Sequence, residues 1–184
     1  MFFPPLFNRI HSWIYEYMAS VHTSDILPDM PAGRLIHTER GVKSLPIQDT
    51  VILHGRLDGI IELDSGGYCV LDIKTTDKVD RLAVNYSLQL NTYAYCLEHS
   101  ADGVFSVAPV KRLGILAFMP NRFAVRHQDA AGIAGSLKWI EVEKDERVVG
   151  KALGEVLPVL RSSTPPESSK KCEWCRYARM RVGL

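Results

Sequence analysis

The sequence predicts an α/β fold in which helices flank a central mixed β-sheet. Residues 50–63 and 68–75 are extended apolar segments separated by a Gly-rich turn at 64–67, which is the pattern of a β-hairpin. The strongest helix candidate, residues 82–98, stands between that hairpin and a further apolar strand at 112–119. Strands that alternate with helices in this way are typical of α/β sheets.

The other elements follow in order along the chain. Five apolar residues recur at helical spacing and predict a first helix over residues 7–20: Phe7, Ile10, Ile14, Tyr17 and Met18. Two prolines and a glycine indicate a loop at 23–33, and residues 34–44 look extended. A last helix is expected over 145–161, before a Ser/Pro-rich linker at 162–169.

Composition places few bounds on function. The chain has 184 residues, enough for one domain with a core, and a formal net charge of +1. A nucleic-acid ligand would therefore need a local basic cleft. No apolar run approaches the roughly 20 residues that span a bilayer. The N-terminus lacks a basic region and is interrupted by Pro4 and Pro5, so it does not resemble a signal peptide. We expect a cytoplasmic protein without a membrane partner.

The chain is expected to divide into a domain at 1–161 and a linker with a tail at 162–184. From Lys170 the tail carries five basic residues and one acidic residue. Cys69 and Cys96 lie in apolar segments and are expected to be buried, whereas Cys172 and Cys175 form a C-x-x-C pair.

The hairpin carries the residues that point to chemistry. Asp72 and Lys74 are two positions apart on one strand, so their side chains share a face. If the turn centres on Ser65, opposed residues have numbers that sum to 130, which places Asp58 opposite Asp72. This register needs an odd-length loop or a bulge at 64–67, because a shift of one residue would turn Asp58 to the other face.

Two carboxylates so close would repel each other unless a cation lies between them. Hard oxygen ligands with open positions suit Mg²⁺ or Mn²⁺. Lys74 would then orient or deprotonate a water molecule, or stabilise negative charge in phosphodiester hydrolysis. An isolated D-x-K is usually a charged pair on a solvated strand face.

A second polar feature follows on the helix at 82–98. Gln89 and Tyr93 are four residues apart and so share a helix face, which Asn85 and Tyr86 extend. Their functional interpretation is a polar stripe that contacts phosphate or positions the lysine. The alternative is a Tyr93 packed in the core beside a surface glutamine.

Together, G-R-L-D58-G, V-L-D72-I-K74-T-T and Q89-L-N-T-Y93 resemble the PD-(D/E)XK nuclease superfamily, in particular its RecB-like branch. The resemblance implies a restriction-endonuclease-like core. It implies that Asp58, Asp72 and the backbone carbonyl of Ile73 bind Mg²⁺ or Mn²⁺, that Lys74 is catalytic, and that Gln89 and Tyr93 form the family's Q-x-x-x-Y motif. The activity it implies is a DNA nuclease, exonucleolytic or preferring single strands, with a helicase or another complex subunit as a further partner.

The chain departs from the family in a minor way, with Asp72 where Glu is common, and in two places that matter more. The upstream ligand found in many relatives is best matched by His11, and His22, Glu39 and His54 stay open. Relatives with an iron–sulfur cluster use four cysteines, whereas this tail has only Cys172 and Cys175, so a cluster within the chain is not expected. We expect a surface C-x-x-C pair with no partner; the alternatives are a remnant of a cluster site and a zinc half-site completed by a second chain. Two alternative functions are a non-catalytic DNA-binding or assembly module and an iron–sulfur exonuclease of the CRISPR-adaptation type.

Overall fold

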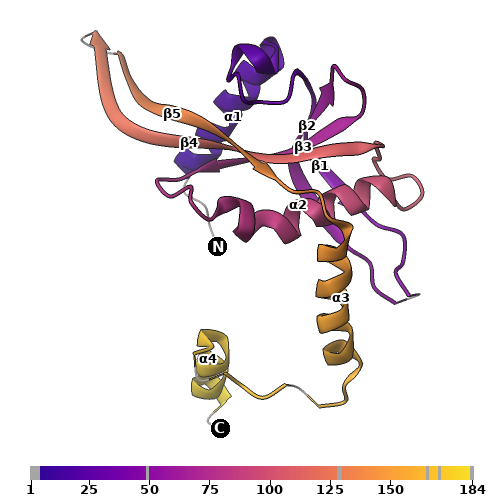
Figure 1. Cartoon of the computed structure of the whole chain (residues 1–184). Helices are drawn as coiled ribbons and strands as arrows, with labels where there is room; N and C mark the ends of the chain where they lie inside the picture. Colours follow the sequence, from indigo (N-terminus) through magenta and orange to yellow (C-terminus); the bar gives the residue numbers. More distant parts are fainter. Residues whose placement is uncertain (1–4, 49, 128–129, 165, 170, 183–184) are drawn as a thin grey trace. The chain divides into compact units, whose positions relative to one another are not determined.

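The computed structural model describes residues 5–48, 50–127, 130–164, 166–169 and 171–182 (Figure 1). The elements are α1 (Pro5–Ser20), η1 (Thr23–Asp25), β1 (Gly33–Lys43), β2 (His54–Leu63), β3 (Tyr68–Thr75), α2 (Leu82–Glu98), β4 (Val110–His127), β5 (Ala130–Val142), α3 (Glu146–Arg161) and α4 (Glu173–Val182). None of these helices is long and apolar enough to cross a membrane.

Five strands form one mixed sheet in the order β1-β2-β3-β4-β5. β3 and β4 are parallel and are joined through α2, whereas the other neighbouring pairs are antiparallel. A parallel pair needs a crossover of this kind, because a tight turn can only join antiparallel strands. The predicted α/β class with a mixed sheet and flanking helices is confirmed.

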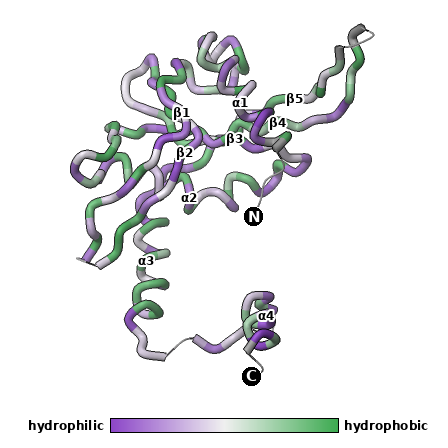
Figure 2. The backbone as a smooth tube through the Cα atoms, turned by 180° about the vertical axis from the view of Figure 1, so that it is seen from behind, coloured by the Kyte–Doolittle hydropathy of each residue, from purple (hydrophilic) through white to green (hydrophobic). Residues whose placement is uncertain are grey.

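The chain divides into two compact units, Met1–Val149 and Gly150–Leu184, which are described separately. The predicted domain boundary after residue 161 stays a prediction. Residues 1–4 of the predicted domain, and Pro165, Lys170 and residues 183–184 of the predicted linker and tail, lie outside the described residues. Hydrophobic and hydrophilic residues alternate along α3, most of which belongs to the second unit (Figure 2).

The register of the β2–β3 hairpin is the predicted one. Its pairs run from Gly59 with Leu71 to Glu62 with Tyr68, so that the paired numbers sum to 130. The loop between the last pair has an odd length, residues 63–67. Gly66 and Gly67 have φ angles of +79° and +82°, a region that side chains with a Cβ rarely adopt. These two glycines therefore permit the turn on which the register depends.

Alternate residues of β3 pack on opposite faces of the sheet. Val70 belongs to the core that includes Leu90 of α2, whereas Ile73 belongs to the core that includes Met18 of α1. Side chains two residues apart share a strand face, so Asp72 and Lys74 lie on the face of Val70, toward α2. The strand's alternation thus delivers both polar side chains to one helix.

Four elements differ from the sequence prediction, two in their boundaries and two in that they were not expected. β2 begins at His54 rather than residue 50, because Ile47 and Val51 form a small bridge before it. β4 continues to residue 127 instead of ending at 119, and β5 was not expected. The first half of β5 is rich in Ala and Gly and lacks apolar alternation, so only its pairing with β4 defines it. Helix α4 also forms within the tail.

We predict that Gly114→Ala lowers the free energy of unfolding by about 1–3 kcal/mol, the usual cost of overpacking. A Cβ at this position in β4 would lie 2.0 Å from Cζ2 of the buried Trp139 ring. Urea unfolding measures the effect. Gly41→Ala in β1 is the matched control, because nothing lies within 4 Å of its Cβ position. Equal stability of the two variants would contradict this packing.

Candidate active site

The candidate site lies where β2 and β3 separate. Within the described residues, the ladder between them ends at Gly59 and Leu71. Beyond that pair, β2 continues to pair with β1, and β3 continues to pair with β4 as far as Thr75. Asp58 and Asp72 are the next residues in register after the last pair. The two strands thus diverge at the two predicted carboxylates.

Asp58 connects the separating strands. Its Oδ2 accepts a hydrogen bond of 2.9 Å from the backbone amide of Ile73. This bond supplies a partner for an amide at the point where the β2–β3 ladder stops. The carboxylate is therefore held against β3 beside Asp72, and it also lines a pocket.

Asp72 is a buried carboxylate with a relative exposure of 1%. Its Oδ1 accepts hydrogen bonds from Lys74 Nζ at 3.0 Å and from Gln89 Nε2 at 3.3 Å. Its Oδ2 lies 2.8 Å from Lys74 Nζ, but within the described chain it has no partner in hydrogen-bond geometry. One buried carboxylate oxygen therefore has unused capacity to bind a positive group.

Burial shifts the pKa values of Asp72 and Lys74 in opposite directions. Burial raises the pKa of Asp72 to about 6, Lys74 opposes this shift, and the negative charge of Asp58 adds to it. For Lys74, burial alone would lower the pKa, but the attraction and hydrogen bond of Asp72 and the attraction of Asp58 raise it overall. The lysine therefore stays protonated near neutral pH, while the carboxyl group titrates just below it.

Helix α2 brings Gln89 and Tyr93 to this pair, as the sequence predicts. The Gln89 amide lies 3.2 Å from the Tyr93 hydroxyl as well as contacting Asp72. Tyr93 packs so closely against β2 that a Cβ on Gly55 would lie 2.6 Å from its ring. One turn before Gln89 in α2, the ring centroid of Tyr86 lies 4.7 Å from Lys74 Nζ, which is a cation–π contact.

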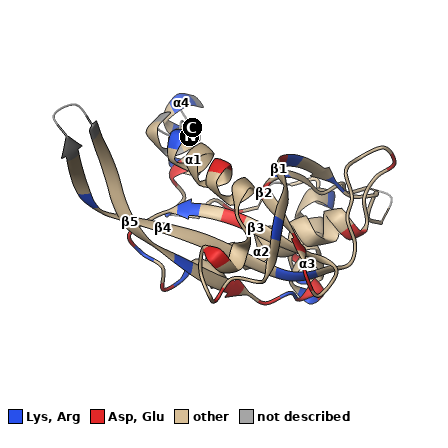
Figure 3. Ribbon diagram, turned by 90° about the horizontal axis from the view of Figure 1, so that it is seen from above, with Lys and Arg blue, Asp and Glu red and all other residues tan. Residues whose placement is uncertain are grey.

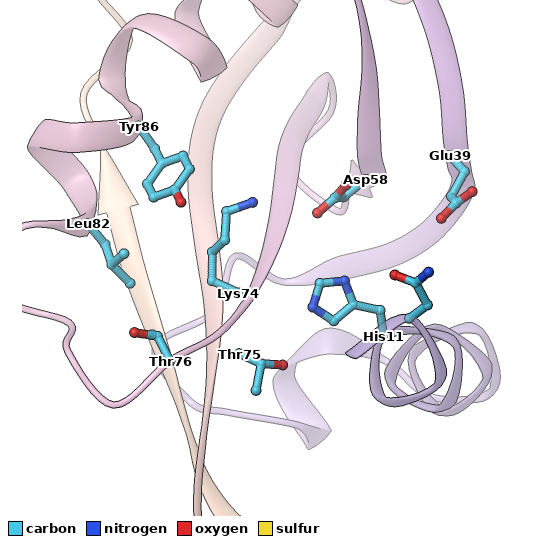
Figure 4. Close-up of a pocket in the computed structure, with 9 residues that line it drawn as sticks. His11, Glu39, Asp58, Lys74, Thr75, Thr76, Leu82 and Tyr86 are labelled. Atoms are coloured by element: carbon cyan, nitrogen blue, oxygen red, sulfur yellow. The ribbon is translucent and has the colours of Figure 1, made fainter. Parts of the chain in front are cut away.

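A pocket of about 400 Å³ opens at this point (Figure 4). Residues of α1, the sheet and α2 line it: Asn8, His11, Glu39, Asp58, Lys74, Thr75, Thr76, Leu82 and Tyr86. Figure 4 shows His11 reaching from α1 toward Asp58 and Lys74. Burial lowers the pKa of His11, the charge of Asp58 raises it, and that of Lys74 lowers it again. Among the candidates for an upstream ligand, His11 and Glu39 thus reach the pocket.

Glu39 lines the pocket and has an unusual backbone conformation. It lies across from Asp58, between the pairs Thr38–Gly59 and Arg40–Leu57, and its φ angle is +50°. This region is uncommon for a residue with a Cβ and typically marks a constrained position. The carboxylate of Glu39 also forms an ion pair with Arg56.

The remaining predicted residues lie elsewhere. His22 caps η1 and contacts Asp64 at 3.0 Å, and the exposed His54 begins β2; neither lines the pocket. In the second unit, the amide of Cys175 donates to Cys172 Sγ over 3.4 Å. The other two cysteines are free and buried, as expected.

Four pocket residues were not predicted: the polar Asn8, Thr75 and Thr76, and the apolar Leu82. Asn8 precedes His11 by three residues and therefore shares its helix face, which is a signal that the sequence does contain. Thr75 and Thr76 directly follow Lys74 at the end of β3. The Thr75 hydroxyl oxygen is buried and lacks a hydrogen-bond partner within the described residues.

A divalent cation fits this donor set. No group of three His, Cys, Asp or Glu side chains in the described residues could hold a metal ion by itself. Two carboxylates, one with an oxygen that accepts no hydrogen bond within the described residues, leave the remaining positions to backbone oxygen and water. Mg²⁺ usually keeps several water ligands and takes few carboxylates, so the arrangement suits it or Mn²⁺ better than Zn²⁺.

Comparisons with known proteins identify a family. The family model of the PD-(D/E)XK nuclease superfamily matches residues 9–180 of the chain. No match was found among curated proteins. The crystal structure of SSO0001 is similar, with a TM-score of 0.51 and 19% sequence identity, over 94% of this chain and 67% of that chain. At this identity the likeness concerns the fold.

We predict that the contribution of Asp72 to the free energy of unfolding of metal-free protein falls as the pH rises from about 4 to about 6. The folded carboxyl of Asp72 has a pKa of about 6 against an ordinary value of 3.8, so the folded chain binds a proton that the unfolded chain has lost. Stability is therefore higher below this window, by up to about 3 kcal/mol. Urea titrations in EDTA, at several pH values, measure it.

Asp72→Asn is the control, because an amide cannot titrate. The difference in unfolding free energy between wild type and Asp72→Asn should vary with pH across this window. A difference that is constant from pH 4 to pH 7 would contradict the raised pKa.

Proposed function

Because the chain belongs to the PD-(D/E)XK nuclease superfamily, we propose that it is a divalent-metal-dependent nuclease that hydrolyses DNA phosphodiester bonds. One observation carries the proposal: the buried Asp72 meets Lys74 and Gln89 where β2 and β3 separate, with Asp58 adjacent. A positive side chain beside two carboxylates at an open pocket suits a reaction that develops negative charge on phosphate.

Asp58 and Asp72 would hold the cation, together with the backbone carbonyl of Ile73. When bound, the cation supplies a Lewis acid for the phosphoryl group and lowers the pKa of its water. The chain's own contribution is to fix both carboxylates. Ile73 anchors Asp58 through its amide, and Gln89 anchors Asp72 through its side chain.

Lys74 would stabilise the charge that develops on the phosphate. Its ammonium group lines the pocket and is held from two sides, by the carboxylate of Asp72 and by the ring of Tyr86. A cation fixed in advance need not reorganise during the reaction, which is the basis of electrostatic catalysis. His11 and Glu39, on the opposite wall, are further candidates for a ligand or for a contact to the attacking water.

The finer assignment is to the RecB-like branch, with exonuclease activity or a preference for single strands. The contact chain from Tyr93 through Gln89 to Asp72 supports the branch, since it gives the Q-x-x-x-Y residues a direct path to the proposed metal site. The preference for ends or single strands is proposed from the family resemblance alone.

Asp72→Asn and Lys74→Ala should each reduce cleavage of labelled DNA by at least about 100-fold, the scale of losing one preorganised electrostatic group. Cleavage would be followed with end-labelled and circular DNA, single- and double-stranded, in Mg²⁺ or Mn²⁺. Cleavage of linear but not circular DNA would identify an exonuclease.

Matched controls lie a few residues along the chain. Asp77→Asn and Lys78→Ala change the same residue types at exposed positions that do not line the pocket. Both should cleave at the wild-type rate. If Asp72→Asn and Lys74→Ala also do so, the proposed active site is wrong.

Metal binding has a test that does not depend on activity. Saturating Mn²⁺ should raise the unfolding midpoint of the wild type by several degrees, because a ligand that binds only the folded state stabilises it. The same addition should leave Asp72→Asn nearly unchanged, as measured by thermal unfolding. An equal rise in both proteins would place Mn²⁺ elsewhere.

A further inference from the structure

Positive charge is concentrated at the C-terminal end of the chain. Residues 170–184 contain five Lys or Arg and one Glu, a net charge of +4. The preceding 169 residues hold 17 basic and 20 acidic residues, a net charge of −3. The net charge of +1 is therefore the sum of a basic C-terminal segment and an acidic remainder. This basic segment contains none of the residues of the proposed active site.

This segment contains α4, which exposes large side chains (Figure 3 shows its Lys and Arg in blue). Trp174 is 80% exposed, Met180 70% and Tyr177 47%. The rings of Trp174 and Tyr177 lie edge to face with centroids 6.4 Å apart. Exposed aromatic side chains grouped in this way usually mark a surface that binds a partner.

Arginines are interleaved with these rings. Arg181 lies 5.6 Å from the Tyr177 ring centroid, and its Nε donates to the Tyr177 hydroxyl over 2.9 Å. Trp174, Tyr177 and Arg181 follow the i, i+3, i+7 spacing and so share one helix face. That face therefore presents flat rings and a guanidinium group together.

The arginine within the aromatic face helps to decide between two kinds of anionic partner, a membrane surface and a single-stranded nucleic acid. A helix that lies in a membrane surface needs an uninterrupted apolar face to insert among lipid chains. Arg181 lies between Trp174 and Tyr177 when α4 is viewed along its axis, so a guanidinium group interrupts the aromatic face. Proteins that bind single-stranded nucleic acid combine aromatic rings, on which bases stack, with cations that follow the phosphates.

We propose that α4 is a binding surface for single-stranded nucleic acid, separate from the pocket that Asp58 and Lys74 line. Trp174 and Tyr177 would stack on unpaired bases, and Arg176, Arg179 and Arg181 would contact phosphates. The proposal rests on the proposed function only in taking a polynucleotide as ligand. It adds that the chain holds its substrate at a second place and prefers unpaired bases.

Fluorescence anisotropy of a labelled 20-nucleotide single strand tests the surface. The full chain carries Asp72→Asn and is kept in EDTA, so that cleavage does not interfere. Trp174→Ala and Tyr177→Ala should each raise Kd at least about fivefold, the lower end of the loss for one base stack. Trp13→Ala, an exposed tryptophan of α1 that does not line the pocket, should bind like its parent.

Salt dependence tests the arginines independently. Replacing Arg176 and Arg179 together with Gln should reduce the slope of log affinity against log salt by about 1.4, since each single-strand phosphate contact contributes about 0.7. Arg34→Gln, at an exposed position of β1, should leave the slope unchanged. An unchanged slope in the double variant would overturn the assignment of these arginines.

Equal affinities of the Trp174→Ala, Tyr177→Ala and Trp13→Ala proteins would overturn the proposal. The proposal would be overturned in favour of a membrane if Trp174→Ala and Tyr177→Ala abolished binding to phosphatidylglycerol–phosphatidylcholine vesicles but left the oligonucleotide affinity unchanged. It would be overturned in favour of a second copy of the chain if these variants lost a dimer seen by sedimentation and kept their oligonucleotide affinity. Tail-dependent binding without any cleavage by the wild type would instead sustain this proposal and refute the nuclease.

Discussion

The separation of β2 from β3 is the constraint on which the site depends. A buried ladder that stops leaves backbone groups in need of partners. Here the carboxylate of Asp58 accepts the amide of Ile73 just past the last strand pair. The Asp58 side chain thus gives the amide of Ile73 a hydrogen-bond partner, and it also lines the pocket beside the separating strands. Continued pairing of the two strands would fill that space with backbone.

The second determinant is the burial of Asp72. A carboxylate removed from water loses solvation that only charged or hydrogen-bonding partners can restore. Lys74 and Gln89 restore part of it, but Oδ2 accepts no hydrogen bond within the described chain and the pKa remains high. Such incomplete compensation is common at functional sites, where an arrangement suited to a ligand costs stability in its absence. The environment of Asp72 is therefore consistent with the proposed role of this carboxylate in holding a cation.

Charge is distributed unevenly along the chain. A net charge of +1 does not indicate an affinity for polyanions, yet the last 15 residues carry +4 and the remainder carries −3. A polyanionic substrate would meet net repulsion from the larger part of the chain outside its lysine-containing pocket. A basic, aromatic segment at one end offers a local attraction that the average charge hides.

The sequence by itself determined the local geometry around Asp72. Side-chain alternation and the two glycines of the turn specify the hairpin register, and the four-residue spacing of Gln89 and Tyr93 specifies their shared helix face. These relations follow from backbone periodicity over short distances, so they can be read from spacing. The family resemblance then supplied the chemical interpretation of those positions.

Only the tertiary structure decided which distant segments complete the pocket. His11 and Glu39 arrive from α1 and β1, and no spacing along the chain relates them to Lys74. β5 exists because β4 offers it a partner, since its Ala- and Gly-rich half has no pattern of its own. The physical reason is that contacts between distant segments depend on which faces bury each other, whereas strand and helix periodicity belongs to the local backbone.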